Sequence, residues 1–236
     1  MEHMAFNGSV NVPEGEMIAS LERLVESSPV DLVYERYSLS SSACATWLQR
    51  LGIPHVLEVN APLEDEVSRY REVLATTEWR QHDSVVFGGA AQVIAVSPDT
   101  ASYAIDRGAN PESTLVLPNG IDERIFHPRS RPPANRRQFL GKRFPEAFVL
   151  GFHGRLRPWH NFEAFVDLAS ALRKRGLAIH VITVGQGGFE EILSARLPTD
   201  AYSVFPWVNH SELGALVRCF DVLPLTYSPE APCYFS

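Results

Sequence analysis

Residues 148–188, FVLGFHGRLRPWHNFEAFVDLASALRKRGLAIHVITVGQGG, decide the fold class of this 236-residue chain. Two apolar runs, residues 148–152 and 179–184, have the length of buried strands. Between them, apolar side chains recur at the spacing of one helix face: Phe162, Phe165, Val166, Ala169 and Leu172. A strand, a helix and a second strand in this order predict parallel pairing through a right-handed crossover.

The same alternation of strands and helices continues on both sides of this stretch. Apolar runs that predict strands occupy residues 30–35, 55–59, 93–97, 113–117, 202–205 and 222–225. Apolar spacing predicts helices at about residues 16–27, 44–51 and 210–220. Asn209 and Glu212 form a capping-box pattern at the start of the last helix. Because the strands are apolar throughout, we expect an α/β fold with parallel sheets buried on both faces.

Residues 127–146 separate the two halves and are rich in proline, arginine and lysine. We interpret this segment as the domain connection followed by a surface helix. Its basic residues are either solvated surface charges or a functional basic patch. We place the boundary within it, which divides the chain into residues 1–140 and 141–236.

Composition excludes several classes of protein. The net charge of −7 argues against a nucleic-acid binder, whose domain would normally be basic. The three cysteines form no Cys-x-x-Cys, so neither a disulfide framework nor a zinc knuckle is predicted, and a cytoplasmic protein is expected. No apolar run reaches the roughly 18 residues of a membrane span. The histidines form no His-x-x-x-His pair, so no metal site is predicted.

The loop that follows residues 148–152 combines several features of a phosphate site. Ligands of open parallel sheets bind beyond the carboxyl ends of the strands. Gly154 would let the backbone approach a ligand, and Arg155 and Arg157 could form charge-assisted bonds to phosphate. His160 directly precedes a predicted helix start, which adds positive potential. The loop therefore predicts a diphosphate site, with a surface arginine on a glycine turn as the alternative.

Other strand ends carry further candidates for ligand binding. These are Asn119 and Gly120, Gly185 and Gly187, and Trp207 and Val208. The two glycine-containing pairs are either ligand-binding turns or plain turns, and neither belongs to a Gly-x-Gly-x-x-Gly motif. The tryptophan either faces a nucleobase or lies in the core. Asn60 is expected at a strand end facing the other half, and Glu58 either points to the same cleft or is a buried, paired carboxylate.

The order and spacing of these motifs resemble glycosyltransferase family 4, whose members are retaining enzymes of the GT-B fold. The resemblance covers about residues 16–236 and rests on DLVYERY at 31–37, EVNAP at 58–62, VIAVS at 93–97, PNGID at 118–122, GRL at 154–156, VGQG at 184–187 and DVLPL at 221–225. It implies two Rossmann-like, doubly wound parallel-sheet domains. Residues 1–140 would be the acceptor-side domain, and residues 141–236 would bind the nucleotide sugar.

The resemblance also implies roles for individual residues. Arg155 matches the arginine that holds the donor diphosphate in the family. The family's lysine falls near His160, and Arg157 could substitute for it. A histidine of the family falls at Asn60, which leaves open the catalytic role of Asn60 and of Glu58.

The chain departs from the family pattern near both ends. Residues 1–15 contain no match to the family's first strand and glycine-rich loop. The family's Glu-x7-Glu segment, which binds the donor's ribose and sugar, would begin near residues 234–236. We therefore expect a fragment in which both domains are incomplete and which has little turnover by itself.

The expected activity is transfer of a sugar, with retention, from a nucleotide-diphosphate donor to a glycan or lipid-linked acceptor, as in polysaccharide biosynthesis. A lipid-linked acceptor would bring peripheral membrane contact. The resemblance implies no metal or other cofactor, because protein cations neutralise the diphosphate. Two alternatives stay open: a GT-B-fold sugar-nucleotide epimerase and a truncated, noncatalytic interaction module.

Overall fold

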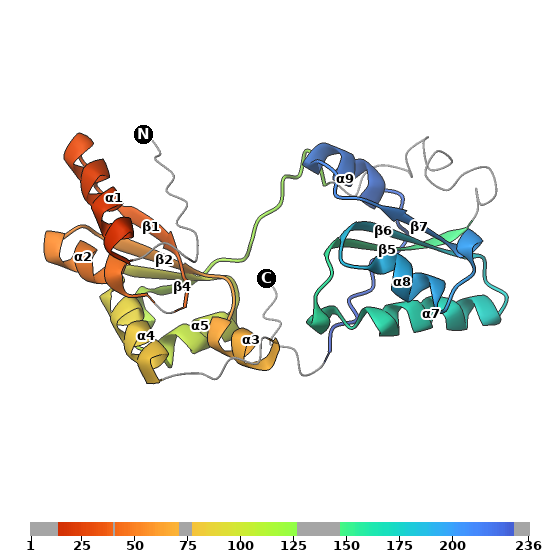
Figure 1. Cartoon of the computed structure of the whole chain (residues 1–236), viewed down its shortest axis with the longest axis horizontal. Helices are drawn as coiled ribbons and strands as arrows, with labels where there is room; N and C mark the ends of the chain where they lie inside the picture. The colour runs from red at the N-terminus through yellow and green to blue at the C-terminus, as the bar shows by residue number, and fades with distance from the viewer. Residues whose placement is uncertain (1–13, 40, 71–76, 127–146, 229–236) are drawn as a thin grey trace. The chain divides into compact units, whose positions relative to one another are not determined.

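The computed structural model describes residues 14–39, 41–70, 77–126 and 147–228, which form two compact α/β units (Figure 1). The described chain passes from the first unit to the second between Asn119 and Gly120. The predicted boundary between residues 140 and 141 lies outside the described residues. None of the helices in the described ranges has the length and apolar character that a bilayer crossing requires.

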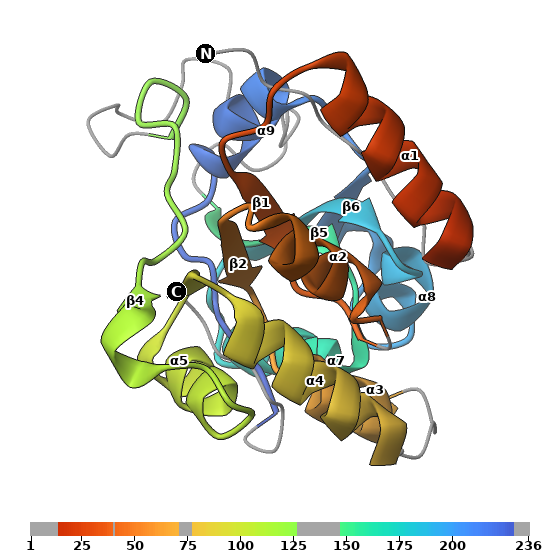
Figure 2. The same ribbon diagram turned by 90° about the vertical axis from the view of Figure 1, so that its left-hand side faces the viewer.

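The first unit contains a four-stranded parallel sheet whose strand order follows the sequence. The strands are β1 (Val33–Arg36), β2 (His55–Val59), β3 (Gln92–Ala95) and β4 (Thr114–Val116). The helices are α1 (Glu14–Ser27), α2 (Ala43–Leu51), α3 (Leu63–Tyr70), α4 (Thr77–Gly89) and α5 (Pro98–Ile105), with a short 3-10 turn at Pro111–Ser113. Sequential strand order with right-handed crossovers places the connecting helices on one face of the sheet. Figure 1 and Figure 2 show α2, α4 and α5 on that face.

Alternate strand residues of this sheet have opposite environments. Leu57, Val59 and Val93 are fully buried in the core beneath these helices. On the other face, Tyr34 is 54% exposed and Leu115 is 50% exposed. The prediction of burial on both faces is therefore wrong for this sheet within the described residues, because a sequential strand order sends every crossover to the same side.

The second unit contains a doubly wound parallel sheet. Its strands are β5 (Phe148–Arg155), β6 (Ile179–Gln186) and β7 (Tyr202–Phe205), in that order. Val222 then pairs in parallel with Leu150, on the edge of β5 that β6 does not occupy. The direction of strand addition therefore reverses at β5, which is the defining feature of a doubly wound sheet.

Helices cover both faces of this second sheet. They are α7 (Phe162–Lys174), α8 (Phe189–Ser194) and α9 (His210–Val217), with short 3-10 turns at Pro158–His160 and Thr199–Ala201. Leu150 and Val181 pack with α7 and α8, whereas Val149 and Ile182 pack with α9 on the opposite face (Figure 1). The prediction of burial on both faces is correct for this unit.

Local signals account for several helix ends. Asn209 Oδ1 accepts a hydrogen bond from the Glu212 amide at 2.9 Å, and the Glu212 carboxylate accepts one from the Asn209 amide at 3.3 Å, so the predicted capping box is confirmed. The Asn161 side chain makes no capping hydrogen bond at the start of α7. Asn161 instead adopts a left-handed conformation (φ 45°) at the end of the 3-10 turn, which asparagine tolerates better than most residues.

Candidate functional site

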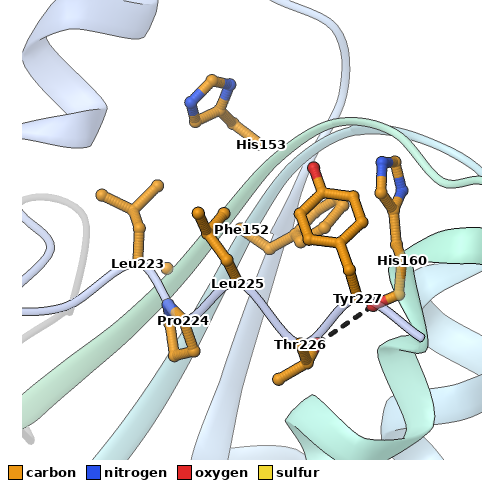
Figure 3. Close-up of a pocket in the computed structure, with 9 residues that line it drawn as sticks. Phe152, His153, His160, Leu223, Pro224, Leu225, Thr226 and Tyr227 are labelled. Atoms are coloured by element: carbon orange, nitrogen blue, oxygen red, sulfur yellow. Dashed lines mark hydrogen bonds between the residues drawn. The ribbon is translucent and has the colours of Figure 1, made fainter. Parts of the chain in front are cut away.

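A pocket lies between residues 151–153 of β5 and residues 223–227, at the edge of β5 where the strand order reverses. Its lining residues are Gly151, Phe152, His153, His160, Leu223, Pro224, Leu225, Thr226 and Tyr227 (Figure 3). Ligands of doubly wound sheets bind at this position. The volume of ≈ 220 Å³ is below the roughly 300–1,000 Å³ of pockets that enclose a drug-sized ligand, so the pocket suits one part of a larger molecule.

Hydrogen bonds hold the 221–228 segment against β5 and the 3-10 turn. The Gly151 amide donates to the Val222 carbonyl at 2.9 Å, and the Val149 amide donates to the Asp221 carboxylate at 2.7 Å. Further along, the Thr226 hydroxyl donates to the His160 carbonyl at 3.0 Å (Figure 3). These contacts make the segment a fixed wall of the pocket. Gly151 must be glycine here, because a Cβ would lie 2.0 Å from the Phe220 ring.

His160 is the member of the predicted diphosphate set that lines the pocket. Its Nδ1 atom accepts a hydrogen bond from the Arg157 amide at 3.0 Å. Burial, and then the nearby Arg157 charge, lower the pKa of His160 below the usual histidine value. Figure 3 shows the His160 ring beside the Tyr227 hydroxyl, with His153 at the far end of the pocket.

The two arginines of the predicted set lie outside the pocket lining. Arg155 is exposed at the end of β5, where its guanidinium donates to the Gln186 side chain at 3.3 Å. The Arg157 guanidinium lies 5.8 Å from the centre of the Trp159 ring, within cation–π range. Gly154 directly precedes Arg155 in β5. It adopts a φ of 124°, a conformation that favours glycine.

Gly185 and Gly187 have a packing role. A Cβ at Gly185 would lie 2.0 Å from the Gly154 carbonyl oxygen, and one at Gly187 would lie 2.4 Å from the Leu156 Cβ. Their lack of side chains lets β5 and β6 stay paired as far as Arg155 and Gln186. Neither glycine lines the pocket, so the described contacts favour the plain-turn alternative.

Trp207 and Val208 follow β7. Trp207 is 64% exposed, so the alternative of a core tryptophan is wrong. Val208 is partly buried against the α9 face of the sheet. Neither residue lines the pocket, and their contact with a nucleobase stays a prediction.

In the first unit, Glu58 is a paired carboxylate. It accepts hydrogen bonds from the Tyr34 hydroxyl at 2.6 Å and from the Asn60 side-chain amide, and the Arg36 guanidinium lies 3.5 Å away. Burial acts to raise the pKa of Glu58, but these three partners together hold it below the usual value. Of the two alternatives for Glu58, pairing is the one observed, and it uses Asn60 as a partner.

Asn119 and Gly120 occupy the crossing between the two units. A Cβ at Gly120 would meet no atom within 4 Å. Shortly before this crossing, the Leu117 amide donates to the Ala95 carbonyl at 2.8 Å. The predicted role of these two residues in donor binding therefore stays a prediction.

Residues 7–120 match the family described as glycosyl transferase 4-like domain. The match covers most of the first unit, including Glu58 and Asn60, so it comes from a different part of the chain than the pocket.

Known proteins with sequence similarity to this chain include two bacterial D-inositol 3-phosphate glycosyltransferases. The protein of Stackebrandtia nassauensis is 28% identical over 151 residues, which are 61% of this chain and 32% of the relative. The protein of Geodermatophilus obscurus is 34% identical over 152 residues, which are 58% of this chain and 33% of the relative. The matched part thus spans about a third of the length of these curated relatives.

Solved structures share the fold across both units. Anabaena Alr3699/HepE in complex with UDP-glucose superposes with a TM-score of 0.67 at 20% identity, covering 93% of this chain and 60% of that chain. At this identity the similarity shows the fold alone. Together with the two parallel sheets, it confirms the predicted α/β class of the GT-B type.

One wall of the pocket, formed by residues 223–227, is absent from the candidates that the sequence suggested. A strand is predicted at 222–225, but the strand-end rule was not applied to it. The same rule at this strand would have identified Thr226 and Tyr227 as candidates.

Proposed function

We propose that this protein is a glycosyltransferase whose second unit binds a nucleotide-diphosphate sugar. The observation that carries the proposal is the pocket at the switch point of a doubly wound sheet, together with an exposed arginine at the end of β5. The names of the two relatives, and the UDP-glucose bound by the structural neighbour, support the same class of activity. We further propose a retaining reaction with a glycan or lipid-linked acceptor. The relatives' names add an inositol phosphate as an acceptor class.

In this proposal, Arg155 binds the donor diphosphate. Its guanidinium is exposed and makes a 3.3 Å contact with a neutral side chain, so a phosphate could replace that contact at little cost. Charge-assisted bonds to the leaving diphosphate would then stabilise the charge that develops in the transition state. Protein cations supply this charge in the proposal, and no metal cofactor is included.

Calorimetric titration with UDP, GDP and ADP tests the donor site. We expect one of the three to bind saturably, and Arg155→Ala to weaken that binding about tenfold or more, because a hydrogen bond to a charged group contributes roughly 1.5–3 kcal/mol. Arg175→Ala is the matched control, since Arg175 is an exposed arginine at the carboxyl end of α7 and therefore at the opposite end of the sheet. Equal binding by the Arg155→Ala and Arg175→Ala variants would contradict the assigned role.

The reaction product separates the remaining alternatives. A transferase consumes the bound sugar nucleotide only when an acceptor is present. Release of an altered sugar nucleotide without acceptor would favour the epimerase. A folded protein that binds none of the three nucleotides but forms stable oligomers would favour the interaction module.

A further inference from the structure

We infer that His160 contacts the donor diphosphate as a neutral hydrogen-bond donor, through its Nε2–H group. This inference rests on the function proposed above. It differs from what the family resemblance implies for this position, where a lysine would supply a second positive charge.

The protonation of the ring follows from its backbone contact. A backbone N–H group can only donate, so the Nδ1 atom that receives the Arg157 amide at 3.0 Å must carry a lone pair. The proton of the neutral ring therefore lies on Nε2. A proton on Nδ1 would place two N–H groups against each other and break the contact that orients the ring.

The ring is also held in place by its aromatic neighbours. Its centre lies 5.2 Å from that of Phe152, 5.9 Å from that of Trp159 and 5.1 Å from that of Tyr227, each in an edge-to-face arrangement. Among the residues that the structure describes, none forms a hydrogen bond with Nε2. A rigid ring with one donor left over is suited to bind an oxygen atom of a ligand in the pocket.

The groups that face the ring disfavour its protonated form. The guanidinium of Arg157 comes from the same turn, His153 faces the pocket from β5, and Tyr227 faces it from the opposite wall. No acidic residue is among the described residues that line the pocket. The imidazolium would therefore lack a carboxylate partner, and the neutral ring leaves Arg155 as the main cation of the proposed diphosphate site.

Two substitutions test the roles of the two ring nitrogen atoms separately. In His160→Gln, the side-chain amide nitrogen can reach the place of Nε2, but the acceptor at Nδ1 is lost. In His160→Asn, the side-chain oxygen can replace Nδ1 as the acceptor for the Arg157 amide, but the donor at Nε2 is lost. The pair therefore distinguishes a ligand contact from a purely structural role in the turn.

The titrations with UDP, GDP and ADP are repeated with both variants. We expect His160→Gln to bind within about threefold of the wild type and His160→Asn to bind about tenfold or more weakly, which is the effect of one hydrogen bond to a charged group. The reverse order, or equal binding by both variants, would overturn the inference. If the wild type binds none of the three nucleotides, the proposed function fails and this contact fails with it.

A measurement without ligand isolates the inference from the proposed function. Long-range ¹H–¹⁵N correlation spectra of protein labelled at histidine report which ring nitrogen carries the proton. At neutral pH we expect His160 to show a protonated Nε2 and an unprotonated Nδ1. A protonated Nδ1, alone or in an imidazolium, would refute the inference even if nucleotides bind as proposed.

Discussion

Replacing Arg107 by methionine is expected to lower the free energy of unfolding of the first unit by about 3–5 kcal/mol, the usual cost of removing one partner from a buried ion pair. The Arg107 side chain is 15% exposed and lies between two carboxylates. Its Nη2 atom donates to Glu64 at 2.6 Å, and its Nε atom lies 3.3 Å from Asp83. Methionine would keep much of the apolar stem but leave both carboxylates without their common cation.

The two carboxylates are deeply buried: Glu64 is 4% exposed and Asp83 is 2% exposed. Asp83 also accepts a hydrogen bond from the Tyr37 hydroxyl at 2.6 Å, and the Arg107 guanidinium lies 3.6 Å above the Tyr103 ring. Burial raises the pKa of Asp83 even with Arg107 in place, which shows how unfavourable the charge is at this position. Because these residues come from α3, α4, α5 and the end of β1, the loss of Arg107 should loosen all three helices.

Arg80→Met is the matched control for this prediction. Its guanidinium lies 3.5 Å from the same Glu64 carboxylate, but its side chain is 73% exposed. An exposed pair contributes at most about 1 kcal/mol, so Arg80→Met should be nearly neutral. Hydrogen exchange of peptides from α3, α4 and α5, together with urea unfolding, measures both variants. Similar small losses in the two would contradict the view that a buried charge holds these helices.

The sequence predicted the β5–α7–β6 unit well because its signals are local. The strand starts at residues 148 and 179 and the apolar face of α7 each depend on residues within a few positions of one another, as does the capping box of α9 at Asn209. The one-sided first sheet was not predictable in this way. Ile94 and Leu115 look like buried strand residues, and only the strand order reveals that their face lacks a covering helix among the described residues.

The candidate site was predictable in position but not in detail. The strand-end rule points to the residues that follow 148–152, and two of them, His153 and His160, line the pocket. The residues of the opposite wall follow a strand that the sequence predicts, but their place beside β5 depends on the bridge between Leu150 and Val222, which no local pattern indicates. The buried network was missed for a similar reason, since Glu64, Asp83 and Arg107 each resemble an ordinary surface charge until tertiary packing brings them together.

Replacing Gly185 by alanine is expected to destabilise the second unit by about 2–6 kcal/mol. A φ of 136° strains any residue with a side chain, which costs roughly 1–3 kcal/mol. The new Cβ would also lie 2.0 Å from the Gly154 carbonyl oxygen. A backbone atom cannot rotate away as a side chain can, so overpacking adds about 1–3 kcal/mol.

Gly154→Ala separates these two contributions. Gly154 has a similar φ of 124°, but a Cβ there would meet no atom within 4 Å. Its expected cost is the strain alone, about 1–3 kcal/mol. Urea unfolding of both variants gives the difference, and equal losses would mean that the close approach of β5 and β6 is unimportant for stability.

The same substitution at Gly185 tests how the sheet shapes the proposed donor site. Gly154 pairs with Gly185, and Arg155 pairs with Gln186, whose side chain holds the Arg155 guanidinium. A Cβ that forces the strands apart at Gly185 must therefore move Arg155 as well. We expect nucleotide binding to weaken in Gly185→Ala under conditions where the unit is still folded. Unchanged binding in the folded variant would show that Arg155 acts independently of the β5–β6 pairing, and the role of the glycine would then be confined to stability.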